Sequence, residues 1–390
     1  MPEFRYGIVG AGRQGTAAAY DLITRGEAAS VVLGDLDPSR ARRAAERVNG
    51  LTRRDRASAA TVDAADRRSL VSFLSGLDAF ISSATYRLNL EVAAAALEAG
   101  THMCDLGGNL EIVRRQLELD AMAKELGVCI VPDCGEAPGL ASNLLAYGTT
   151  LVDRVDELIL YDGGIPEQPT PPWNYFLTFN VDGLTTEYDG TTTWRVGGKL
   201  VDVECLDPSE DELVDFGPPF GVLEAFAAAT GSTTPWTLGE RVPTLKAKVV
   251  RYPGHVAQFR AFRDLGLFGE APVEVDGARV VPRDVFHALL EPKIRAAEGD
   301  RDIVVARVVA RGERDGRPAE ASVDLRVHPD EALGFTAMEQ ATGWHAAIMC
   351  HRMAGGRIPP GAIPVELAVD PREMLAELRA RGFEVVERLR

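Results

Sequence analysis

The first 150 residues alternate short apolar segments with longer segments of helical periodicity. Five apolar segments have the length and composition of buried strands: residues 4–10, 30–35, 78–84, 102–108 and 128–135. Four Ala- or Leu-rich segments have helical character: residues 14–26, 38–50, 89–100 and 110–127. Pro38 at the start of one helix, and Gly26 and Gly100 at the ends of two others, are typical of helix boundaries. This alternation predicts a doubly wound α/β domain, with a parallel sheet covered by helices on both faces.

From about residue 151 the pattern changes to β-rich segments separated by turns. Two hairpins are predicted, turning at Gly197-Gly198 and at Asp315-Gly316, together with a helix over 221–231. The last 55 residues return to helical periodicity at 336–356 and 370–383. We therefore expect residues 1–150 and 336–390 to form the first domain. Residues 151–335 are expected to form an inserted, mostly antiparallel α+β domain.

Composition excludes several classes of partner. The 58 acidic residues outnumber the 42 basic ones, and a net charge of −16 argues against nucleic acid and anionic membranes as partners. The five cysteines are scattered without CxxC spacing, so we expect no disulfide framework and no metal site. The first residues show no basic-then-apolar leader, and no apolar stretch approaches the ~20 residues of a membrane helix. We expect a cytoplasmic protein.

A glycine-rich turn follows the first predicted strand. Gly10, Gly12 and Gly15 form GxGxxG, in which the glycines permit a tight turn, close approach of a pyrophosphate and helix–strand packing. This context predicts a Rossmann-type dinucleotide site. Asp35, at the end of the second strand, is placed to bind the adenosine ribose and favours NAD over NADP, whereas Arg40 nearby would favour a 2′-phosphate. The turn residues assigned to the cofactor are Gly10, Ala11, Gly12, Arg13, Gln14 and Gly15.

Further cofactor contacts are expected where later strands end, because open α/β sheets bind ligands at the carboxyl ends of their strands. The candidates are Ser83, Ala84, Thr85, Leu106, Gly107 and Asn109. Asp63 follows a further strand, the third in chain order, expected between the helix over 38–50 and the strand over 78–84. It is a candidate neighbour of the adenine, and a solvated loop acid explains it nearly as well.

Several stretches resemble one family: "GIVGAGRQG", "DLGGN", "DCGEAPGLASNLLAY", "KAKVVRYPGH" and "ATGWHAAIMCHRM". They are similar to the saccharopine dehydrogenase-like amino-acid dehydrogenases. The segment "PPWNYFLTFNVDGLTTEYDG" most resembles the L-lysine 6-dehydrogenase branch. The resemblance implies hydride transfer from a C–N carbon to nicotinamide, hydrolysis of the resulting iminium, and a homo-oligomer, either a dimer or larger. Such a site needs a cation for the substrate carboxylate, a proton acceptor for its ammonium and a shaped slot.

The motif RYPGH offers two of these groups. Arg251 can grip a carboxylate and His255 titrates near neutral pH, with Pro253-Gly254 turning the chain so that both face one cleft. The alternative is that both are polar groups of a bulge pointing to solvent.

Acids at strand ends are candidates for receiving the ammonium. Asp105 and Glu136 follow the fifth and sixth strands, although Glu136 also suits the first turn of a helix. Lys246, Tyr175 and Thr342 are further candidates for substrate contact. Their alternatives are a solvated lysine, an aromatic packing group and a helix cap, respectively.

Three functions remain open from the sequence. The leading one is NAD-dependent oxidative deamination of the terminal amine of L-lysine, a small amino-acid substrate. The second is a saccharopine or carboxynorspermidine-type reductase using NADP, whose substrate carries extra carboxylates and needs more cations. The third is an NAD-binding sensor without catalysis.

Overall fold

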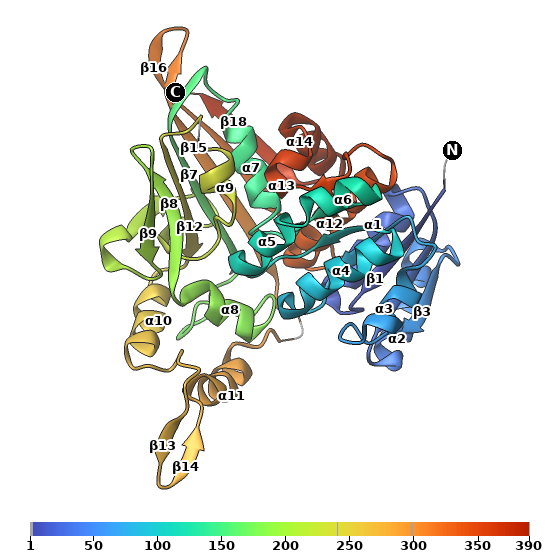
Figure 1. Ribbon diagram of the computed structural model, residues 1–390. Helices are drawn as coiled ribbons and strands as arrows, with labels where there is room; N and C mark the ends of the chain where they lie inside the picture. The colour runs from blue at the N-terminus through green and yellow to red at the C-terminus, as the bar shows by residue number, and fades with distance from the viewer. Residues whose placement is uncertain (1–2, 240, 298, 390) are drawn as a thin grey trace.

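The computed structural model describes residues 3–239, 241–297 and 299–389, which form two lobes (Figure 1). Each lobe is built on its own sheet, and helices fill the space between and around the two sheets. Within the described ranges, no helix combines the length and apolar character needed to cross a membrane.

The first lobe contains a parallel sheet, as predicted. Over the described residues it has seven strands, in the spatial order β17 (Gly361–Ala362), β6 (Cys129–Val131), β5 (His102–Asp105), β4 (Ala79–Ser82), β1 (Phe4–Val9), β2 (Ala28–Asp35) and β3 (Ala57–Thr61). The order reverses at β1, so the edge between β1 and β4 is the switch point where such sheets bind ligands. The fold class is therefore the predicted doubly wound α/β type.

Helices cover both faces of this sheet. One face carries α1 (Arg13–Arg25), α2 (Pro38–Thr52) and α12 (Ala337–Ala354). The other face carries α3 (Arg67–Leu74), α4 (Asn89–Ala99) and α6 (Asp120–Leu126). The helix predicted over 110–127 is two helices, α5 (Leu110–Leu117) and α6. Between them a tighter 3₁₀-type bond joins Leu119 N–H to the carbonyl of Gln116 at 3.1 Å.

The second lobe contains a mixed sheet. Its main path in the described chain is β10 (Glu212–Asp215), β11 (Val222–Ala227), β12 (Thr244–Arg251), β7 (Arg154–Pro166), β15 (Asp302–Arg314), β16 (Arg317–Val327) and β18 (Glu384–Leu389). The hairpin of β8 (Thr191–Val196) and β9 (Lys199–Glu204) joins it through β12. Strands β7 and β12 run parallel, whereas the other pairs are antiparallel. Both predicted hairpins, at Gly197-Gly198 and Asp315-Gly316, are present.

Residues 221–231 do not form the predicted helix. Residues Val222–Ala227 are strand β11, which hydrogen-bonds to β10 on one side and β12 on the other. Leu223 and Ala225 are fully buried, whereas Val222 is 45% exposed at the strand's start. Pairing with two neighbours outweighs the weak helical preference of the alanines, because propensity yields to tertiary context.

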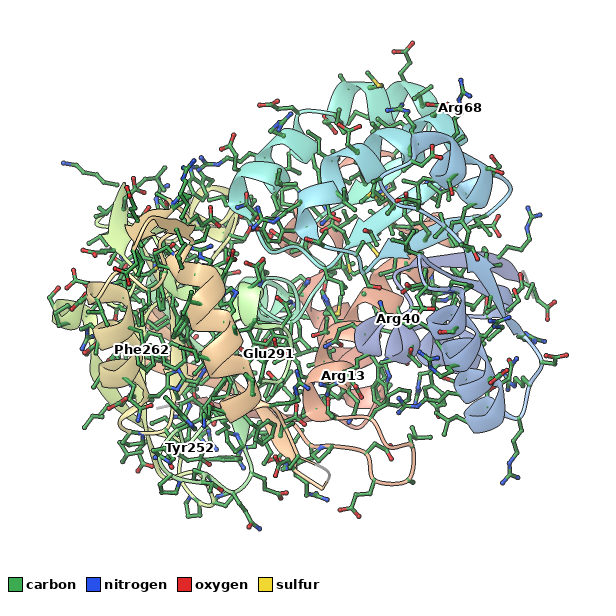
Figure 2. All side chains as sticks on the ribbon, turned by 90° about the horizontal axis from the view of Figure 1, so that it is seen from below. Arg13, Arg40, Arg68, Tyr252, Phe262 and Glu291 are labelled. Atoms are coloured by element: carbon green, nitrogen blue, oxygen red, sulfur yellow. The ribbon has the colours of Figure 1, made fainter. Side chains whose placement is uncertain are left out.

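The remaining helices lie around the second sheet. They are α7 (Leu140–Gly148), α8 (Val181–Tyr188), α9 (Thr234–Thr237), α10 (His255–Asp264), α11 (Pro282–Ile294), α13 (Val365–Ala368) and α14 (Pro371–Ala380), with 3₁₀ turns at Tyr86–Leu88 and Pro208–Glu210. A small hairpin of β13 (Val273–Val275) and β14 (Ala278–Val280) projects from the body beside α11 (Figure 1). Figure 2 shows Tyr252, Phe262 and Glu291 on this lobe and Arg13 and Arg40 on the other.

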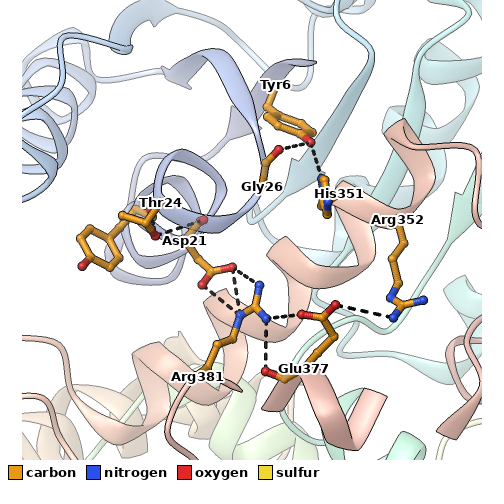
Figure 3. Close-up of polar contacts among 9 residues, drawn as sticks. Tyr6, Asp21, Thr24, Gly26, His351, Arg352, Glu377 and Arg381 are labelled. Atoms are coloured by element: carbon orange, nitrogen blue, oxygen red, sulfur yellow. Dashed lines mark hydrogen bonds and ion pairs between the residues drawn. The ribbon is translucent and has the colours of Figure 1, made fainter. Parts of the chain in front are cut away.

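The C-terminal segment contacts both lobes. Helices α12 and α14 are helical as predicted, but β18 pairs with β16, so the second sheet extends beyond the predicted boundary at residue 335. A buried ion-pair network joins α1, α12 and α14 (Figure 3). In it, Arg381 lies 2.7 Å from both Asp21 and Glu377, and Arg352 lies 3.7 Å from Glu377. We call these four residues the α1–α14 network.

Candidate active site

The glycine turn has open space where a ligand would lie. A Cβ on Gly15 would lie 2.2 Å from the carbonyl oxygen of Gly10, and Gly10 itself has φ +101°, so neither position tolerates a side chain. A Cβ on Gly12 would meet nothing within 4 Å. No side chain caps the start of α1, so its first N–H groups are free to bind an anion. The turn therefore fits a dinucleotide pyrophosphate.

Asp35 lies beside this turn at the end of β2. Its carboxylate accepts hydrogen bonds from the N–H of Ala11 at 3.0 Å and of Asp37 at 2.9 Å. Arg40 approaches it to 3.5 Å and remains half exposed, and Arg13 turns away to Glu339 at 2.6 Å. Asp35, which would favour NAD, and Arg40, which would favour NADP, are therefore direct neighbours at the end of β2.

A cleft of about 650 Å³ lies next to the turn and is lined by both lobes. Ten of the predicted site residues line it: Gln14, Ser83, Ala84, Thr85, Leu106, Gly107, Asn109, Glu136, Arg251 and Thr342. The other predicted residues lie outside the lining: Gly10, Ala11, Gly12, Arg13, Gly15, Asp35, Asp63, Asp105, Tyr175, Lys246 and His255. Of these, Asp63 accepts the N–H of Ala65 in the loop after β3.

Asp105 does not reach the cleft as predicted. It is fully buried, and its carboxylate accepts hydrogen bonds from Gln116 Nε2 at 2.7 Å and from the N–H groups of Gly107 and Asp133. Burial raises its pKa to about 6, while these hydrogen bonds oppose the shift. Asp105 therefore organises the loops that follow β5 and β6, rather than facing substrate.

His255 also differs from the expectation. The turn at Pro253-Gly254 exists, but His255 begins α10 with its ring stacked on Phe259 at 4.3 Å and tilted against Tyr175 at 5.0 Å. The ring shares a 3.1 Å hydrogen bond with the Tyr188 hydroxyl and is 1% exposed. Burial and the charge of Arg251 hold its pKa well below the usual value, so the imidazole is neutral.

Tyr175 supports the site from outside the cleft, whereas Lys246 lies apart from it. The Tyr175 ring lies 5.4 Å from the guanidinium carbon of Arg251, beneath which it packs. Lys246 shares a face of β12 with Lys248, but both are bound to Glu210, at 2.9 and 3.4 Å. The lysines therefore stabilise the second sheet near Trp194.

Arg251 lies among three carboxyl groups, of which Glu136 and Asp162 are buried and Glu187 is partly exposed. Its Nη2 is 3.3 Å from Glu187 of α8, and Asp162 of β7 and Glu136 of the loop after β6 complete the group. Glu136 lies beside Asp162, whose charge adds to burial in raising the pKa of Glu136, and Glu136 Oε1 and Asp162 Oδ1 both lack a hydrogen-bond partner. Burial raises the pKa of Glu187 to about 7 and of Asp162 to about 6, and it holds that of Glu136 well above its usual value. We call these four residues the mixed-charge cluster.

Acidic side chains predominate over the whole cleft. Of the described residues that line it, one is basic, Arg251, and seven are acidic: Glu111, Asp133, Glu136, Asp162, Asp182, Glu187 and Asp189. Several acceptors there lack a partner, including Gln14 Oε1, Thr186 Oγ1 and Thr230 Oγ1. A ligand that donates hydrogen bonds and carries positive charge fits this lining.

The cleft is also lined by four polar residues that were not among the predicted ones: Asp133, Asp162, Glu187 and Ser232. Asp133 follows β6 at its carboxyl end, a signal that we used for other residues and overlooked here, whereas Asp162 follows a run of buried apolar residues inside β7. Glu187 and Ser232 carry no comparable signal, because they reach the cleft from a helix and a loop of the second lobe.

Across the part of the chain that the structure describes, no group of three or more His, Cys, Asp or Glu side chains could hold a metal ion. The five cysteines are buried and unbridged.

Two family models match the chain in succession. Residues 6–131 match the saccharopine dehydrogenase NADP binding domain, and residues 135–383 match the saccharopine dehydrogenase C-terminal domain.

Two solved structures share the fold over nearly the whole chain. One is apo saccharopine dehydrogenase (L-Glu forming) from Saccharomyces cerevisiae, with TM-score 0.80 and 17% identity over 99% of this chain and 100% of that one. The other is a homospermidine synthase from Legionella pneumophila in complex with NAD, with TM-score 0.67 and 12% identity over 99% and 91%. The chain belongs to the saccharopine dehydrogenase family of oxidoreductases, and its first lobe is the family's dinucleotide-binding domain.

Proposed function

We propose that this enzyme oxidises the terminal amine of L-lysine with NAD, releasing ammonia and the 6-semialdehyde. When bound, the nicotinamide would accept a hydride from the amine-bearing carbon. The glycine turn, the free N–H groups at the start of α1 and Asp35 would hold the dinucleotide. The protein's own residues then have to hold the two ends of lysine and remove a proton from one of them.

The observation that supports lysine most is the mixed-charge cluster. An amino-acid head group carries an ammonium and a carboxylate on one carbon, so its site must present both charges close together. Arg251 offers a cation with an unpartnered Nε, and Glu187 and Asp162 offer anions beside it. A bidentate guanidinium–carboxylate contact would fix the head group, leaving the side chain to extend along the cleft.

The charge balance of the cleft disfavours larger acidic substrates. Saccharopine carries additional carboxylates, which would face the seven acids of the described lining with Arg251 as their one basic partner there. Each unpaired carboxylate would pay a desolvation penalty and repulsion from its neighbours.

A polyamine or diamine is the second candidate, and the same acid excess favours it. Such a substrate has ammonium groups at both ends and needs no guanidinium. Cadaverine, which is lysine without its carboxylate, separates the two candidates.

The test is NADH formation by the purified enzyme with lysine, ornithine, cadaverine, spermidine and saccharopine, each also tried with NADP. We expect lysine with NAD to give the highest kcat/KM, at least tenfold above cadaverine. Equal values for lysine and cadaverine would favour the second candidate. Turnover of saccharopine alone would refute both, and absence of turnover with every compound would favour the non-catalytic sensor.

A further inference from the structure

Asp133 is a buried acid on the cleft wall, separate from the mixed-charge cluster. It follows β6 with φ +63°, a left-handed conformation that Asp adopts more readily than most residues. Its carboxyl lies directly over Gly107, where an added Cβ would be 2.1 Å from Asp133 Oδ1. Gly107 belongs to the loop after β5 that is expected to border the nicotinamide, so Asp133 occupies the nucleotide end of the cleft.

One oxygen of Asp133 is bound and the other is not. The Ser232 hydroxyl donates a hydrogen bond to Oδ2, and Ser232 itself has a strained φ of +39°. Oδ1 is buried and has no partner, although Asp133 is only 1% exposed and lines the cleft. An unpartnered buried acceptor is costly in a native fold unless something else completes it.

Resting on the lysine proposal above, we propose that Asp133 receives the terminal ammonium of the substrate and accepts its proton, with Ser232 orienting the carboxylate. In this step one N–H bond of the ammonium breaks and one O–H bond forms on Asp133. No electrons are exchanged, and a neutral amine is left beside the nicotinamide. Only the neutral amine has the lone pair that drives hydride loss from the adjacent carbon.

The electrostatic surroundings suit this role. Burial raises the pKa of Asp133 to about 8, the Ser232 hydrogen bond opposes the shift, and Asp105 and Glu366 add to it. The titratable groups that face it are Asp105 of β5, Glu366 of α13 and the neighbouring Cys134. A base with a pKa near the working pH transfers protons most effectively, and a bound ammonium would favour its ionised form.

The other acids are less suited to this step. Asp105 has its carboxylate saturated by hydrogen bonds from Gln116 and two backbone N–H groups. Glu136 and Asp162 each keep one unpartnered oxygen, but both belong with Arg251 to the mixed-charge cluster, and Glu187 is paired with Arg251. Asp133 is the cleft acid that combines a free oxygen with a position over Gly107.

The main experiment measures kcat/KM for lysine against pH in the wild type and in Asp133→Asn. We expect wild-type kcat/KM to rise with pH through about 8, because the base must lose its proton first. Asp133→Asn should lower kcat by about 10²- to 10⁴-fold and remove that limb of the profile. Its affinity for NAD should be unchanged, and its calorimetric Kd for lysine should weaken at least tenfold.

The pH profile of kcat/KM also tests whether Ser232 positions Asp133. Ser232→Ala removes the hydrogen bond that lowers the Asp133 pKa, so the limb of the pH profile should move to higher pH. Asp302→Asn is the matched control, since Asp302 is equally buried and also has a raised pKa, yet it binds the start of α12 outside the cleft.

Two outcomes would overturn the inference, and they differ. If Asp133→Asn keeps the wild-type rate, pH profile and lysine affinity, Asp133 is not the base, while the lysine activity stands. If the wild type neither oxidises nor binds any amine, the proposed function fails and the role of Asp133 fails with it.

Discussion

The molecule contains two buried clusters of arginine and acid that are assembled differently. In the α1–α14 network, Arg381 donates from Nε and both Nη atoms to Asp21 and Glu377, and Arg352 adds a second cation. In the mixed-charge cluster, three acids surround one arginine, whose Nε is unpartnered. One arginine Nε lacks a partner in each cluster, on Arg352 and on Arg251, so the difference lies in the charges. The α1–α14 network sets two cations against two acids, whereas the mixed-charge cluster sets one cation against three acids. In the function proposed above, the substrate would complete the pairing in the second cluster.

The largest expected effect follows from removing Arg251. Arg251→Ala should raise the KM for lysine sharply and lower kcat/KM by about a thousandfold, because the substrate carboxylate loses its cation and three acids remain unpaired. Steady-state kinetics with lysine check this, with circular dichroism to show that the variant is folded.

Arg251→Lys is the matched control for that experiment. It keeps the positive charge but loses the planar guanidinium that binds a carboxylate with two hydrogen bonds. The variant should therefore fold, with a KM between those of the wild type and Arg251→Ala. An unchanged KM in Arg251→Ala would return this arginine to a purely structural role.

The opposite result is expected in the α1–α14 network, where a substitution should reduce stability and leave activity unchanged. Arg381→Ala leaves Asp21 buried without its partner, and this should lower the free energy of unfolding by about 3 kcal/mol. The kcat/KM of the folded enzyme should stay at the wild-type value, because the network does not line the cleft. Denaturant unfolding and kinetics on the same preparation measure both quantities. A comparable fall in kcat/KM would erase the distinction between the clusters.

The smallest effect concerns pH and Glu187. The folded protein holds the Glu187 proton up to about pH 7, whereas the unfolded chain releases it near the ordinary value. The folded state therefore binds more protons between those values and loses stability as pH rises through them. Glu187→Gln should remove about 2 kcal/mol of that loss between about pH 5 and 8. Denaturant unfolding of the wild type and of Glu187→Gln across this pH range measures the difference.

Local signals predicted most of the first lobe. The strand–helix alternation, the glycine turn and Asp35 each depend on nearby residues, and the structure has them where the spacing puts them. The second lobe was harder, because the strand Val222–Ala227 is decided by its two neighbours rather than by its own alanines. The parallel pairing of β7 with β12 also joins segments about 90 residues apart, which no local pattern records.

The site was predictable at its nucleotide end and only partly at its substrate end. Arg251 and Glu136 were identified, yet their neighbours Asp162 and Glu187 come from a different strand and helix. Asp105 and His255 have suitable chemistry, but hydrogen bonds to Asp105 and aromatic packing around His255 turn both away from the cleft. Residue type gives the chemistry available, and only tertiary packing decides which groups face the ligand.

Helix α12 has a consequence for how the protein is made. It packs on α1 and against β4 and β5, so one face of the first sheet is covered by residues synthesised more than 200 positions later. A nascent chain that has left the ribosome only as far as β6 would expose that apolar face to water. The nucleotide lobe therefore completes its folding only near the end of translation, and a truncated gene product that ends at residue 131 would be prone to aggregate.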